Sequence, residues 1–208
     1  MLKFIIGILL AVVLAVAAYY VWDSGLFSKL GNVPERSEET GSMAPQQVAT
    51  NTYATTTFSI VYPDNFTVDD NYRYEGVPNK PIIGVKFTIP ADMATGTNLS
   101  SDTYLSVEWL PRALNCTGDI YILPNVRAQK LTEAGVVYSF ATTSSAAAGN
   151  LYEEMAYALT DSTPCIAVRY FIHSTNLGTY EPGSVREYDR SALLRALDAI
   201  RHSIILTQ

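Results

Sequence analysis

The sequence has only two cysteines and two histidines among its 208 residues, and this scarcity limits its chemistry. Neither histidine lies at ligand spacing from a cysteine, so a zinc site is not supported. The G-x-S-x-G, H-E-x-x-H, Walker and G-x-G-x-x-G patterns are also missing, which leaves hydrolase, metalloprotease and nucleotide-enzyme functions without support. We therefore expect no metal, no cofactor and no catalytic residue of a known type.

Basic clusters are missing as well. The chain has 14 Lys and Arg against 20 Asp and Glu, for a net charge of −6. A protein that binds nucleic acid neutralises phosphates with clustered Lys and Arg side chains. Nucleic acid is therefore not an expected partner, and the acidic balance indicates ordinary solubility.

One long apolar run is present, "FIIGILLAVVLAVAAYYVW" at Phe4 to Trp22. A transmembrane helix needs about 20 apolar residues. Lys3 precedes the run and an acidic segment follows it, which predicts a cytoplasmic N-terminus. We expect residues 1–22 to be an uncleaved signal anchor that binds the membrane. A cleaved signal peptide, which would release a periplasmic or secreted protein, is the alternative, because Ala15 and Ala17 form an A-x-A site.

Residues 23–52 are rich in Gly, Ser, Pro, Glu and Gln and have few large apolar side chains. Such a composition buries too little surface to offset the entropy lost on ordering. The sequence thus predicts a flexible linker over residues 23–52 and one extracytoplasmic domain over residues 53–208.

Short runs with alternating apolar residues follow, bounded by Pro, Gly and Asn. Clear examples are "TTTFSIVYP", "PIIGVKFTIP", "DTYLSVEWLP", "VVYSFATT", "NLYEEMAYALT" and "PCIAVRYFIH". Period-two alternation indicates half-buried strands, and their close spacing favours antiparallel pairing. The predicted class is α+β, an antiparallel sheet preceded by one N-terminal transmembrane helix.

A helix is predicted near the end, in "DRSALLRALDAIRHS", with Asp189 as its N-cap. Its leucines fall on one side, so this amphipathic helix should pack on the sheet. Arg190, Arg195, Asp198 and Arg201 are expected mainly on the opposite, polar side. The following "IILT" is a candidate for a last strand or an extended tail.

Cys116 and Cys165 both lie on the exported side of the apolar run. An even number of cysteines in an oxidising compartment favours a disulfide, so we expect these two to be bridged.

Cys165 also stands near Arg169 and His173 in "PCIAVRYFIH", which raises the alternative of a reactive site. If this run is a strand, Cys165 and His173 are about 26 Å apart and cannot act as a dyad. Arg169 and His173 would share the more polar face of the sheet, where Glu153 or Glu154 could pair with Arg169. Arg169 and His173 remain as candidate ligand-binding residues.

The phrase "FSIVYPDNF" and the closing helix that runs into "IRHSIIL" resemble exported PsbP/Mog1-like domains. Those domains open on an F-x-I-x-Y-P-x-x-F/W phrase and end in a helix that crosses the sheet. The resemblance implies a fold and a tendency towards binding or assembly, with no shared catalytic residues.

We accordingly expect a membrane-anchored, extracytoplasmic module that binds an envelope protein or a small ligand. Two alternatives stay open. One is an enzyme with a site on the polar sheet face near Arg169 and His173, and the other is a subunit of an envelope assembly.

The anchor can be tested by alkaline carbonate extraction. The chain should stay in the membrane pellet, because a spanning helix resists conditions that strip peripheral proteins. Release of a soluble product that starts near Ala18 would instead establish signal cleavage.

Overall fold

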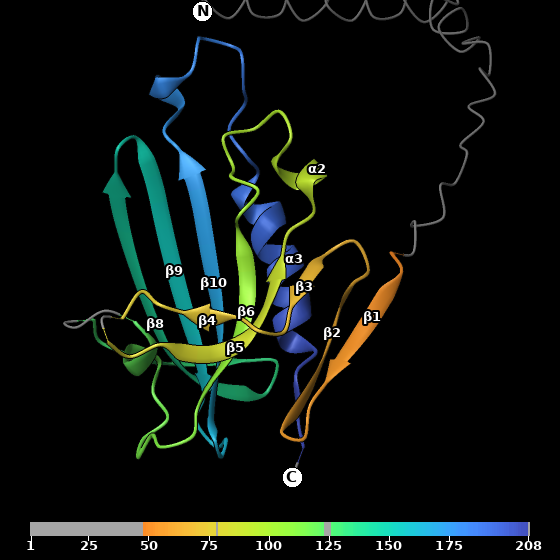
Figure 1. Cartoon of the computed structure of the whole chain (residues 1–208), viewed down its shortest axis with the longest axis vertical. Helices are drawn as coiled ribbons and strands as arrows, with labels where there is room; N and C mark the ends of the chain where they lie inside the picture. The colour runs from red at the N-terminus through yellow and green to blue at the C-terminus, as the bar shows by residue number, and fades with distance from the viewer. Residues whose placement is uncertain (1–47, 78, 123–125, 208) are drawn as a thin grey trace, which may run out of the picture. The chain divides into compact units, whose positions relative to one another are not determined.

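An eight-stranded antiparallel sheet forms the centre of the computed structural model, which describes residues 48–77, 79–122 and 126–207 (Figure 1). A C-terminal helix accompanies the sheet, so the predicted α+β class is confirmed. The expected anchor, residues 1–22, lies outside the described residues. Within the described ranges, no helix is long and apolar enough to cross a membrane.

The strands of this sheet follow the order β3-β5-β6-β10-β9-β8-β7, and β4 pairs with β5. Five of the six alternating runs quoted from the sequence form its longer members, and "TTTFSIVYP" belongs to the smaller sheet. The strands are β3 (Thr67–Asp69), β4 (Arg73–Tyr74), β5 (Ile82–Thr88), β6 (Tyr104–Leu110), β7 (Gln129–Glu133), β8 (Val136–Ala147), β9 (Asn150–Leu159) and β10 (Cys165–Thr175).

A second sheet has three strands, β1 (Thr50–Ala54), β2 (Phe58–Pro63) and β11 (Ile205–Leu206), in the order β1-β2-β11. The last strand suggested by "IILT" is therefore present. β1 begins within residues 23–52, so the predicted linker boundary is too late by a few residues. Backbone pairing with β2 holds the exposed strand β1 in place. The composition of residues 50–54 does not indicate this pairing.

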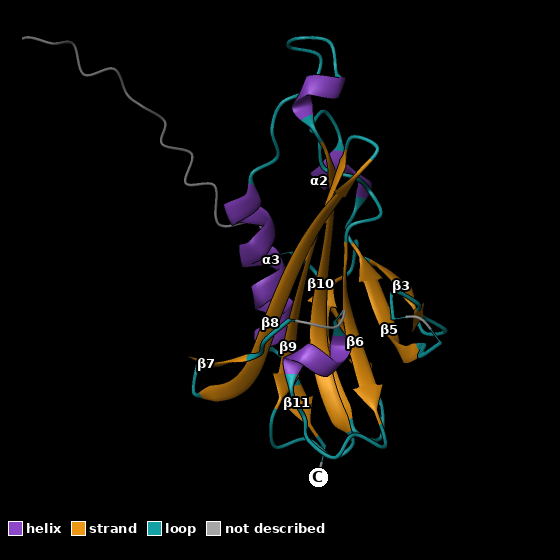
Figure 2. Ribbon diagram, turned by 90° about the vertical axis from the view of Figure 1, so that its left-hand side faces the viewer, coloured by secondary structure: helices purple, strands orange, loops and turns teal. Residues whose placement is uncertain are grey.

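Helix α3 (Arg190–His202) packs on one face of the large sheet (Figure 2). The Asp189 side chain accepts a hydrogen bond from the Ala192 amide at 2.9 Å, which confirms the predicted N-cap. Leu193, Leu197 and Ile200 are buried against the sheet. The shorter helices are α2 (Ala91–Ala94), η1 (Gly118–Tyr121) and η2 (Leu177–Thr179).

The placement of Arg201 on the polar side of the helix is wrong, since only 1% of this residue is exposed. Its guanidinium donates to Asp198 at 2.8 Å, to Glu133 at 2.5 Å and to the Tyr170 hydroxyl at 2.8 Å. It also lies 4.1 Å from the centroid of the Tyr157 ring. These contacts offset much of the loss of hydration, although the buried Nη1 has no hydrogen-bond partner among the described residues, so the helix buries a charge on its sheet side.

The opposite face of the large sheet is covered by β4 and by the segment that contains η1. Gly118 lies so close to this face that a Cβ atom there would come within 2.6 Å of the Ser139 carbonyl oxygen. Cys116 and Cys165 form a disulfide, as predicted, which ties this covering segment to the start of β10.

Reduction should destabilise the domain, because the bridge closes a loop with a sequence separation of 49 residues. The chain-entropy model assigns about 4 kcal/mol to such a loop. Urea unfolding of the full chain, with and without reductant, measures this difference. A double variant, Cys116→Ser with Cys165→Ser, is the control and should not respond to reductant. A free-thiol signal at both cysteines of the full chain isolated under non-reducing conditions would contradict the bridge.

Candidate functional site

Strand β10 presents different side chains to the two faces of the sheet. Ile166, Val168, Tyr170 and Ile172 are buried in the core beneath α3 and the small sheet, as the alternation predicted. Cys165, Arg169 and His173 share the other face, together with Phe171. The two candidate residues therefore lie on one face, with Phe171 between them.

Arg169 is completely buried and forms a closed network of ion pairs. Its Nε and Nη2 donate to the two carboxylate oxygens of Glu108, at 2.8 and 2.9 Å. Its Nη1 donates to Glu154 at 2.6 Å, so the expected cross-strand pairing is confirmed with Glu154. Nη2 also donates to the Tyr121 carbonyl oxygen. The Tyr74 ring covers the guanidinium, with its centroid 3.6 Å from Cζ.

Two carboxylates face one guanidinium, and hydroxyl groups stabilise the additional negative charge. The Ser106 hydroxyl donates to Glu108 at 2.8 Å, and the Tyr74 hydroxyl donates to Glu154 at 2.7 Å. Burial alone would lower the pKa of Arg169, but Glu108 and the other neighbours raise it above its ordinary value. The guanidinium therefore stays charged, and its partners are protein groups.

His173 lies in a different setting. Its Nδ1 is 2.8 Å from Asp102 Oδ1, and its ring stacks on Tyr152 with centroids 4.6 Å apart. Among the described residues, its buried Nε2 has no hydrogen-bond partner. Four residues along a strand separate it from Arg169 by about 13 Å. The structure thus does not bring the two residues into one site, and a ligand role for either stays a prediction.

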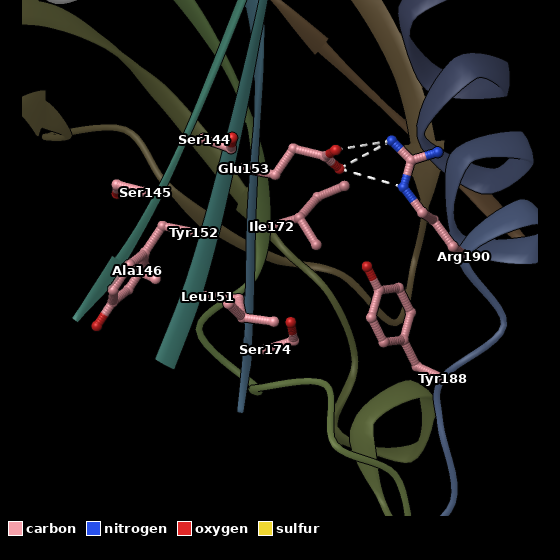
Figure 3. Close-up of a pocket in the computed structure, with 10 residues that line it drawn as sticks. All are labelled: Ser144, Ser145, Ala146, Leu151, Tyr152, Glu153, Ile172, Ser174, Tyr188 and Arg190. Carbon is pink, nitrogen blue, oxygen red and sulfur yellow. Dashed lines mark hydrogen bonds and ion pairs between the residues drawn. The ribbon is translucent and has the colours of Figure 1, made fainter. Parts of the chain in front are cut away.

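A groove of about 470 Å³ opens on the helix-side face, at the end of the sheet where β8 turns into β9 (Figure 3). Strands β8, β9 and β10 form its floor, and the chain entering α3 forms its opposite wall. Because α3 begins only at Arg190, this end of the sheet is left uncovered. Its walls carry apolar groups, including Leu151 and Ile172, and hydroxyls, including those of Ser144, Ser174 and Tyr188.

One ion pair closes the side of the groove nearest the helix. Arg190 Nη2 donates to both carboxylate oxygens of Glu153 at 2.9 Å, as Figure 3 shows. Hydrogen bonding to the Glu153 carboxylate raises the pKa of Arg190. The side chains are 48% and 31% exposed, so the groove presents both charges at its rim without a net charge.

A larger cavity, of about 1180 Å³, lies between Val77 with residues 80–82 on one side and residues 110–120 on the other, next to the disulfide. Lys80, Arg112 and Asp119 line it together with Leu114, which is 99% exposed. Its walls are mostly loops, together with the strand residues Ile82 and Leu110 and part of η1, and loop conformations are generally less fixed than those of paired strands. We therefore take the groove, which rests on three strands and a helix, as the candidate site.

Sequence reasoning missed Glu108, Tyr74 and the groove residues. Glu108 had a detectable signal, because period-two alternation puts Ser106 and Glu108 on the face opposite Leu105 and Val107. Tyr188 and Arg190 had none, since their approach to β9 depends on where the chain returns to the sheet.

No protein-family model matches this chain, and no curated protein is significantly similar to it in sequence. Within residues 48–77, 79–122 and 126–207, no group of three or more His, Cys, Asp or Glu side chains is placed to hold a metal ion. The site is therefore interpreted from its own geometry.

The network around Arg169 can be compared with the exposed pair of Arg190. Arg169→Met should lower the free energy of unfolding by about 3–5 kcal/mol, because it leaves two carboxylates without their cation. Arg190→Met should cost about 0–1 kcal/mol, because its pair is partly exposed. Urea unfolding monitored by near-ultraviolet circular dichroism gives both values.

If Arg169→Met fails to fold, Glu154→Gln provides a milder test, since it removes the charge of one partner only. If Arg169→Met and Arg190→Met lowered the free energy of unfolding by the same amount, the structural role of the Arg169 network would be contradicted.

Proposed function

We propose that the chain is a membrane-anchored, extracytoplasmic binding or assembly module that binds a protein segment or small ligand in the groove beside β8. The observation that carries this proposal is the groove itself. The groove is open to solvent, and its lining combines apolar side chains with hydroxyl groups. The charges of Arg190 and Glu153 at its rim neutralise each other. Binding sites commonly combine an apolar lining with a few polar groups that fix orientation.

The proposed location rests on the disulfide and on the sequence of the first residues. Disulfides persist in oxidising compartments and are rare in the cytosol. The apolar run at residues 1–22 would anchor the chain, with a cleaved signal peptide as the alternative. The antiparallel sheet and its closing helix also agree in outline with the resemblance to PsbP/Mog1-like domains, which remains a proposal at the level of the fold.

Binding is favoured over catalysis because the charged groups are already engaged with each other. The Arg169 guanidinium has protein partners on all three nitrogens, and Glu153 holds Arg190. A general base must lie within hydrogen-bond reach of the proton that it removes. His173 lies on the other face of the sheet from the groove. An enzyme site near Arg169 and His173, the alternative, would require the covering segment with Tyr74 to move away.

The groove can be tested with a photo-reactive benzoylphenylalanine in place of Leu151, which is 43% exposed on the groove floor. The full chain in its native membrane should give a discrete adduct on irradiation, several-fold stronger than from the same group at Thr132. Thr132 is the matched control because it is exposed on β7, away from the groove.

Mass spectrometry of the adduct separates a protein partner from a small ligand. Adding Tyr188→Asp, which places a charge in the groove wall, should abolish the adduct. Equal labelling at both positions, or an adduct insensitive to Tyr188→Asp, would contradict binding in the groove.

A further inference from the structure

Strand β8 is longer than the strand that pairs with its outer side. β7 pairs with Val136 through Phe140, whereas β8 continues to Ala147 and pairs with β9 from Tyr138 to Ala147. The backbone at Ala141 lies against Gly118. From Thr142 to Ala147, five of the six residues are exposed, and Figure 1 shows this part of β8 as the outermost strand on its side of the sheet. The outward backbone groups there face no described strand.

This edge lacks the features that usually protect open strands. Natural edge strands are kept short, charged or interrupted by proline, which prevents pairing with other chains. β7 has five residues including Lys130 and Glu133, and β3 has three residues with Asp69 paired to Lys86. β8 has twelve residues from Val136 to Ala147, none of them charged and none proline.

The open edge and the groove are parts of the same surface. Ser144, Ser145 and Ala146 belong to both, since they line the groove next to Leu151 and Ile172. β1 is also uncharged, but β8 combines an open edge with a groove beside it. Side chains of a strand added at this edge would point alternately toward the groove face and away from it.

We propose that the edge Thr142–Ala147 accepts an extended peptide segment of a partner protein as an additional strand, whose alternate side chains enter the groove. This inference rests on the proposed binding function and names its partner. Main-chain hydrogen bonds would supply affinity, and the groove would supply selectivity for apolar residues at every second position. The small Ser and Ala side chains leave room for larger ones on the peptide.

A second copy of the chain fits this edge less well. Six residues extend about 20 Å. Two such edges of Ala, Ser and Thr, paired with each other, would bury much less accessible surface than a stable interface, which buries at least about 1,200 Å². A peptide gains additional burial from the groove, which a copy of β8 itself would not fill.

The test is a selection of heptapeptides on the immobilised full chain, with threonine at alternate positions and the remaining positions randomised. Selected peptides are then resynthesised with N-methyl groups on every second residue, in each of the two registers. One register should weaken binding at least tenfold, because it removes the N–H groups that face β8. The other should change binding less than threefold. Hydrogen exchange should slow at alternate amides of Thr142–Ala147.

Leu151→Asp, which alters the groove, should also reduce binding at least tenfold, whereas Thr52→Asp on β1 is the matched control and should not. If peptides depend on Leu151 but tolerate both methylation registers, strand addition is overturned and the binding function stands. If no peptide is enriched, the inference is overturned, and the crosslink at Leu151 decides the binding function separately. Without peptide, the amides of Thr142–Ala147 should exchange equally fast at low and high protein concentration. Slower exchange at high concentration would contradict the proposal and would show that the edge pairs with a second copy of the chain.

Discussion

The buried charge of Arg169 is the constraint on which the second face of the sheet depends. A guanidinium without water requires anionic and hydrogen-bonding partners, and unpaired burial would cost several kcal/mol. Those partners come from four separate segments. Glu108 lies on β6, Glu154 on β9, Tyr74 on β4 and the Tyr121 carbonyl in η1. One side chain thus fixes how the neighbouring strands and their covering segment meet.

The two faces of the large sheet differ in how completely other segments cover them. The covering segment is held by the Arg169 network and by the disulfide, so that face is filled with protein. On the helix side, α3 begins at Arg190 and leaves the end of the β8–β9 hairpin without cover. The long hairpin therefore creates both the groove and the open edge. The extension of β8 past β7 thus leaves both the groove and the open edge at this end of the sheet.

Particular residues show how far the sequence could lead. The alternation of Ile166, Val168, Tyr170 and Ile172 predicted strand β10 and its buried face, because a strand repeats every two residues whatever its neighbours. Asp189 predicted the start of α3, because capping is a local interaction. Arg201 was assigned to the wrong side, since helical periodicity cannot show that Glu133 and Tyr170 lie near enough to compensate a buried charge. β1 was missed because pairing with β2, rather than its own composition, holds it.

The sequence by itself determined the longer strands β2, β5, β6, β8, β9 and β10, the closing helix and the partners of the disulfide, because periodicity, capping and cysteine number are local or countable properties. The tertiary structure alone decided what Arg169 does. Its complete burial and its pairing with Glu108 on β6 depend on which strands are neighbours. The groove beside β8 and the open edge from Thr142 to Ala147 were decided in the same way. Both depend on where one element ends relative to another that is distant in sequence, and no local pattern records that relation.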